Sequence, residues 1–149
     1  MKQLIPVMVA AASLTFAANV NASEATKAIV ASYLKIQAAL AADKTDGIKP
    51  AAQEIAKQAA TMGASGAAIA KASKVMEGAA DIKAARAAFA PLSDAVIKAA
   101  SADDWKDVSG VKLGFCPMVG HRWVQKDGQV SNPYYGKQML TCGELKNPK

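Results

Sequence analysis

Apolar residues recur every three or four positions over most of the chain, which is the period of one face of an α-helix. In the first such stretch, Ile29, Tyr33, Ile36 and Leu40 form the apolar face. The stretches with this pattern are 24–43, 48–62, 65–77 and 82–101. Pro91 falls inside the last of them and should kink or split that helix near Ala90, because proline lacks the backbone N–H.

Four helical stretches with short links and narrow apolar faces predict a mainly α fold, an antiparallel helix bundle over about 24–101. Many positions on these faces are alanine. Alanine lets helices approach closely, but each alanine buries little apolar area. Because burial stabilises a fold by about 25 cal/mol per Å², each alanine contributes little stability. The bundle core is therefore thin, and a covalent or metal staple elsewhere would add a large share of the stability.

The helical period stops after Trp105. The pattern over about 108–145 predicts a small C-terminal module with a β-hairpin and irregular segments. Two short apolar runs, 123–125 and 129–130, flank Lys126-Asp127-Gly128, and Asp-Gly between such runs is a hairpin signal. The stretch 132–136 (NPYYG) predicts a tight turn. On this interpretation Cys116 precedes the hairpin and Cys142 follows it.

The N-terminal residues predict a signal peptide. Lys2 precedes an almost continuous apolar run over 4–18, and Val20-Asn21-Ala22 places small residues where a signal peptidase cleaves. The apolar run is shorter than the roughly 20 residues that span a bilayer. We therefore expect cleavage after Ala22 and a single exported, periplasmic domain over 23–149, without stable membrane insertion.

Charge and composition argue against two classes of function. Lys2 is the only charged residue of 1–22, so its removal lowers the net charge from +6 to +5. The remaining lysines are scattered and not arranged as a basic stripe, which disfavours nucleic-acid binding. One histidine, no Ser/His/acid set and no glycine-rich phosphate loop predict that the protein is not an enzyme.

The tail gathers the residues that could carry chemistry. Soft ligands and one imidazole occur here at Cys116, Met118, His121, Met139 and Cys142. Thiolate and thioether ligands select Cu(I) or Ag(I), whereas the carboxylates that harder ions prefer are missing from the cluster. The alternative is a structural disulfide, because an exported chain with two cysteines normally pairs them. Oxidised cysteines would leave the two methionines and the histidine as a weaker copper site.

The structural disulfide implies a different function from the metal site. In a disulfide-stabilised protein-interaction or scaffold domain without metal, the methionines fill the core and aromatic side chains form the packing or docking surface. The residues predicted for that surface are Trp123, Tyr134 and Tyr135.

Several motifs together resemble one bacterial family, domain of unknown function 3347. The motifs are Cys116-Pro-Met118, Trp123 with Gln125, 132–136 (NPYYG), 139–143 (MLTCG), Tyr33-Leu34 and 89–94 (FAPLSD). The resemblance implies a small exported domain related to those attached to periplasmic adaptor subunits of copper and silver efflux pumps, and hence a metal-efflux component as partner. Family members tend to have a longer glycine-rich insert before the tryptophan, so His121 is a candidate ligand on local chemistry alone.

Overall fold

The computed structural model of the chain describes the backbone of residues 16–149 and the side chains of residues 22–149. Most of the predicted signal peptide therefore lies outside the described residues. The helices are α1 (Phe16–Ala41), α2 (Ile48–Thr61), the short 3₁₀ helix η1 (Gly63–Gly66), α3 (Ala67–Glu77) and α4 (Ile82–Ala102). Within the described residues, no helix is both long and apolar enough to cross a membrane.

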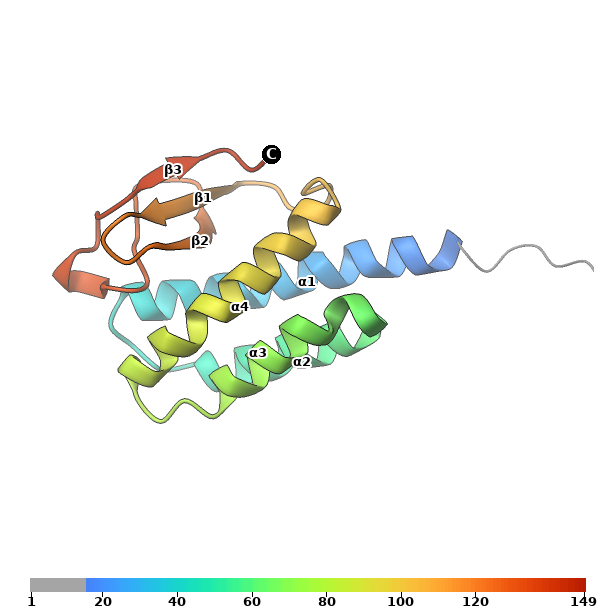
Figure 1. Cartoon of the computed structure of the whole chain (residues 1–149), viewed down its shortest axis with the longest axis horizontal. Helices are drawn as coiled ribbons and strands as arrows, with labels where there is room; N and C mark the ends of the chain where they lie inside the picture. The colour runs from blue at the N-terminus through green and yellow to red at the C-terminus, as the bar shows by residue number, and fades with distance from the viewer. Residues whose placement is uncertain (1–15) are drawn as a thin grey trace, which may run out of the picture.

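The four α-helices pack as the predicted bundle. Figure 1 shows α1 as the longest rod, with α4 crossing it and α2 and α3 side by side beneath. Ile36, Ile55 and Phe89 are fully buried, each on a different helix, so the three-four spacing identified the inward faces correctly. Ala52 and Ala59 on α2 are fully buried as well.

The helix α4 continues through Pro91, so of the two predicted effects of this proline, a kink or a split near Ala90, the split does not occur. Phe89 and Leu92, on either side of Pro91, are both fully buried. Burial of these two side chains in the core offsets the one backbone hydrogen bond that proline removes.

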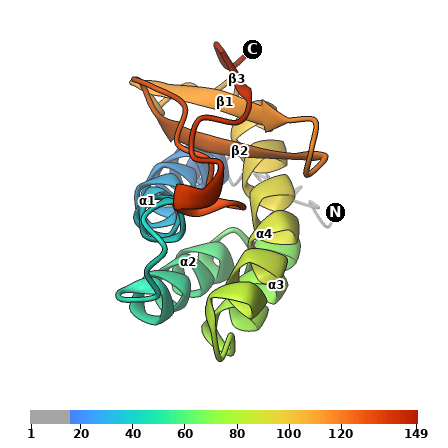
Figure 2. The same ribbon diagram turned by 90° about the vertical axis from the view of Figure 1, so that its left-hand side faces the viewer.

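A three-stranded antiparallel sheet completes the fold. Its strands are β1 (Val111–Cys116), β2 (His121–Lys126) and β3 (Glu144–Lys146), in the order β2-β1-β3. Figure 2 shows the sheet above α1 and α4, with β2 nearest the helices and with α2 and α3 on the far side of the bundle. The fold class is therefore the predicted one: a helix bundle with a small C-terminal β module.

The hairpin does not turn where the sequence suggested. Strand β2 pairs with β1, with Leu113 opposite Val124 and Cys116 opposite His121. The turn between them is 117–120, closed by a 2.9 Å hydrogen bond from the Gly120 N–H to the Cys116 carbonyl. Gly120 has φ +70°, a conformation that glycine adopts without strain. Asp127 and Gly128 instead lead the chain out of the sheet.

Candidate functional site around the Cys116–Cys142 disulfide

Cys116 and Cys142 form a disulfide, with their Cα atoms 5.9 Å apart. The prediction that these residues lie adjacent is confirmed. Cys116 is the last residue of β1, the central strand, and its side chain is fully buried. Cys142 lies between the 3₁₀ helix η2 (Gly136–Gln138) and β3, and is half-buried. The bridge therefore joins a rigid strand to an irregular loop.

The other predicted ligands are backbone neighbours of the two bridged cysteines. Met118 lies in the β1–β2 turn and its side chain is 67% exposed. His121 is the cross-strand partner of Cys116. Met139 is half-buried, and its carbonyl accepts a 3.0 Å hydrogen bond from the Cys142 N–H. The fold thus gathers at one corner five residues that the sequence spreads over 27 positions, 116–142.

In the disulfide form both cysteine sulfurs bond to each other and not to a metal. Among residues 22–149, no three His, Cys, Asp or Glu side chains are grouped so as to hold a metal ion. The His121 ring packs 5.3 Å from the ring of Tyr134, centroid to centroid. The candidate ligands outside the bridge are the two thioethers and the His121 imidazole.

Two residues predicted for a docking surface are interior residues, which corrects that prediction. Trp123 is fully buried, and Tyr134 is only 8% exposed. The Trp123 indole lies over the backbone of β1, where a Cβ atom at Gly114 would overlap the ring. Its Nε1–H donates to the Gln125 Oε1 at 3.0 Å, and its ring meets that of Tyr134 edge-on at 6.2 Å. Only Tyr135, the third residue, is partly exposed.

Two tyrosine hydroxyls cover the free edge of β2. The Val124 N–H donates to the hydroxyl oxygen of Tyr33 on α1 at 3.2 Å, and the Tyr134 hydroxyl donates to the Arg122 carbonyl at 2.8 Å. Ser93 on α4 hydrogen-bonds the Tyr33 hydroxyl. Burial raises the pKa of both tyrosines well above the ordinary value, so they are neutral hydroxyls. They satisfy backbone groups that an edge strand would otherwise leave open.

The variant Tyr33→Phe tests this edge. Removing the hydroxyl leaves the buried Val124 N–H without its acceptor, so we expect a loss of about 1–3 kcal/mol in the free energy of unfolding. Urea denaturation followed by circular dichroism measures it. Tyr135→Phe, at a half-buried position, is the matched control and should change stability little. A Tyr33→Phe protein as stable as the wild type would contradict the edge-covering role.

The tail is anchored to the bundle by a residue that the sequence analysis missed, Arg86 on α4. Its guanidinium donates to the Leu40 carbonyl and the Pro133 carbonyl, both at 2.9 Å, and pairs with Asp43 at 2.5 Å. The other Asp43 oxygen accepts from the Lys137 N–H at 3.1 Å. The hydrogen bonds from Arg86 and from this N–H hold the pKa of Asp43 below its usual value.

The sequence of the turn 132–136 contains an indication of this anchor. Asn132 Oδ1 accepts hydrogen bonds from the N–H groups of Tyr134 and Tyr135, which confirms the predicted tight turn. Gly136, at its end, has φ +57°, and a Cβ there would overlap both Asp43 and Arg86. The glycine therefore indicates a close approach by another segment, but not which one.

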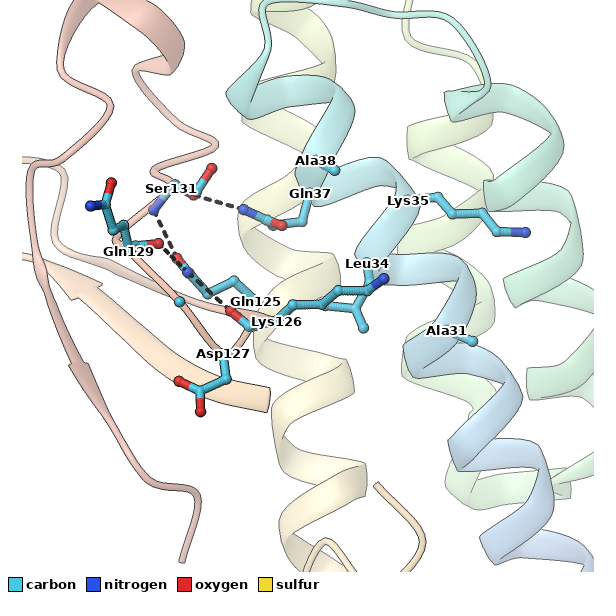
Figure 3. Close-up of a pocket in the computed structure, with 11 residues that line it drawn as sticks. Ala31, Leu34, Lys35, Gln37, Ala38, Gln125, Lys126, Asp127, Gln129 and Ser131 are labelled. Carbon is cyan, nitrogen blue, oxygen red and sulfur yellow. Dashed lines mark hydrogen bonds between the residues drawn. The ribbon is translucent and has the colours of Figure 1, made fainter. Parts of the chain in front are cut away.

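A groove of about 550 Å³ lies between α1 and the segment that follows β2. Figure 3 shows the amide network along it: Gln37 donates to the Ser131 carbonyl at 2.7 Å, and Gln125 donates to the Gln129 carbonyl at 2.7 Å. The Ser131 N–H returns a 2.9 Å bond to Gln125 Oε1. These bonds link the loop to the strand and helix that flank it, so the amides serve mainly to hold the groove wall.

The fold and this corner define a class of protein, a small four-helix bundle whose C-terminal sheet module is closed by a disulfide. The chain belongs to the family described as protein of unknown function (DUF3347), whose model matches residues 29–107, just over half of its 149 residues. The resemblance seen in the sequence is thereby confirmed, although the match covers the helices and ends before the tail motifs. No curated protein and no solved structure matches the chain.

Proposed function

We propose that the protein is an exported, periplasmic, non-enzymatic domain that binds a soft monovalent ion, Cu(I) or Ag(I), at the corner around Cys116 and Cys142. The observation that supports the proposal is that the backbones of all five candidate ligand residues lie at this one corner. Met118 follows Cys116 in the turn, His121 faces it across the hairpin, and Met139 bonds to Cys142 through the backbone.

The two redox forms differ in the donors that they offer. When the cysteines are reduced, two thiolates attached to backbones 5.9 Å apart join the thioethers of Met118 and Met139. Thiolates and thioethers are the ligands that Cu(I) prefers. When the cysteines are bridged, the thioethers and His121 remain and form a weaker site. The resemblance to domains attached to efflux adaptors suggests a periplasmic metal-efflux component as the partner that receives the ion.

A competition titration tests this function. The reduced wild type should withdraw Cu(I) from a chromogenic chelator. Met118→Leu with Met139→Leu removes two direct ligands and should weaken uptake roughly tenfold or more, since loss of even an outer-shell partner costs about that much. Leucine keeps nearly the same volume, so the fold should persist.

Met62→Leu with Met76→Leu provides the matched control, because Met62 and Met76 belong to the bundle and not to the tail. This variant should bind Cu(I) as the wild type does. If the reduced wild type withdraws no copper, or if both double variants bind equally well, the metal-binding proposal fails.

The second candidate function is a disulfide-stabilised interaction domain without metal. Apolar side chains near the bridge favour it, since Met118 is 67% exposed, Phe115 39% and Leu140 36%. Exposed apolar side chains of this size are common at protein-binding surfaces. The same titration separates the two candidates, because this one predicts that the wild type withdraws no copper in either redox state.

A further inference from the structure

The two cysteines of the disulfide differ in burial. Cys116 is fully buried at the end of the central strand, with β2 on one side and β3 on the other. Cys142 is half-buried, and its chain neighbour Thr141 is exposed. In thiol–disulfide exchange, the sulfur that is attacked depends on access as well as on thiol pKa.

The loop at Cys142 is fixed by hydrogen bonds and packed on its inner side. Asn132 Nδ2–H donates to the Cys142 carbonyl at 2.9 Å, and the Cys142 N–H donates to the Met139 carbonyl at 3.0 Å, so the backbone here is held in place. Behind it, a Cβ at Gly143 would crowd both the Phe115 carbonyl and the Trp123 indole. The inner side is therefore packed, and an incoming group reaches the bridge from the side of Cys142.

We propose that this disulfide is a thiol-exchange site with a fixed direction of attack. An incoming thiolate bonds to Sγ of Cys142, the bond between the two Sγ atoms breaks, and Sγ of Cys116 departs with the electron pair and takes up a proton. The product is a mixed disulfide at Cys142 and a buried thiol at Cys116. The disulfide is reduced by two electrons only when a second thiol of the donor displaces Cys142, which oxidises the donor to its own disulfide.

The chemical class of the partner follows from this step. After the first attack Cys116 stays next to Cys142, because β1 and the loop remain held by their own hydrogen bonds, and it can expel a monothiol donor by the reverse reaction. A donor that carries both thiols resolves the mixed disulfide intramolecularly and so completes the reduction. The partner is therefore a dithiol reductant, and the exposed side chains of Met118 and Leu140 are the apolar contacts available to it near Cys142.

The exchange site rests on the proposed function for its biological role alone, since reduction creates the thiolates that would bind the soft ion. The direction of attack depends only on burial. It is tested with a chelator present and no metal added, so that a failed copper titration and a failed exchange experiment are separate results.

The test compares the single variants Cys116→Ser, which leaves the Cys142 thiol, and Cys142→Ser, which leaves the Cys116 thiol. Under native conditions, Cys142 should react with 5,5′-dithiobis(2-nitrobenzoic acid) roughly tenfold or more faster than Cys116, because access governs the rate. In denaturant the two rates should become similar, which shows that the fold causes the difference. Equal native rates, or a faster Cys116, would overturn the proposal.

A measurement on the oxidised wild type covers the case in which a single variant fails to fold. The protein is treated with glutathione, quenched with acid and mapped by peptide mass spectrometry. Because Cys116 can expel glutathione again, only the fraction trapped by the acid quench carries the adduct, and in that fraction we expect glutathione on Cys142 and a free thiol at Cys116. Glutathione found mainly on Cys116, or divided evenly between the two, would show that the attack has no preferred direction.

Discussion

Replacing Trp123 by alanine is expected to lower the free energy of unfolding by about 3–5 kcal/mol, the largest effect of any single change considered for this protein. The side chain is fully buried and fills the space between β1 and the tail. Gly114 and Gly143 both approach the ring so closely that neither could carry a Cβ without crowding it. Alanine would leave a cavity that this rigid backbone could collapse into only in part.

Thermal and urea unfolding measure this loss, with Val75→Ala as the control. Val75 is 56% exposed on α3, so its truncation should change stability by no more than about 0.5 kcal/mol. A cost of less than about 1 kcal/mol for Trp123→Ala would contradict a core position for Trp123 in the tail.

Loss of the disulfide should destabilise the protein by roughly 3–4 kcal/mol on the loop-entropy model, because the bridge closes a separation of 26 residues. This loss is a large share of the total free energy of unfolding, which is only about 5–15 kcal/mol for a domain and which an alanine-rich core does little to raise. The double variant Cys116→Ser with Cys142→Ser, and the wild type in excess dithiothreitol, should both show the loss as a lower denaturation midpoint.

The two ways of removing the bridge control for each other, since dithiothreitol leaves the cysteine side chains in place. Met118→Ser serves as a second control, because it changes an exposed residue of the same corner without breaking the bridge. Identical midpoints with and without dithiothreitol would contradict a stabilising disulfide. A reduced protein that keeps its helical circular dichroism would show that the bundle folds without the disulfide.

The two largest effects have different origins in the chain. The disulfide could be anticipated from composition, because the chain has two cysteines and its first residues predict export to an oxidising compartment. The importance of Trp123 could not, because a lone tryptophan in a tail is compatible with either a core or a docking position. Its burial depends on Gly114 in β1 and on Gly143 in the loop before β3, two segments that are separate in sequence.

The helical half of the fold follows closely from the amino-acid pattern, because the three-four period is a local property of each segment. It identified the buried faces of Ile36, Ile55 and Phe89 before any contact was known. The turn at Asn132 could likewise be predicted, because the Asn132 side chain accepts hydrogen bonds from backbone N–H groups only two and three residues away. In these cases the causes lie within a few residues of one another.

The tail was decided by contacts between distant segments. Asp127-Gly128 carries the stronger local hairpin signal, yet the strands turn at 117–120, where pairing with β1 lets β2 bury Trp123 and Val124. Likewise, the Arg86–Asp43 anchor joins residues 43 positions apart. Local sequence encodes the preference of each segment for a conformation, whereas the choice between competing pairings depends on the summed burial and hydrogen bonding of the whole molecule, and only the tertiary structure contains that sum.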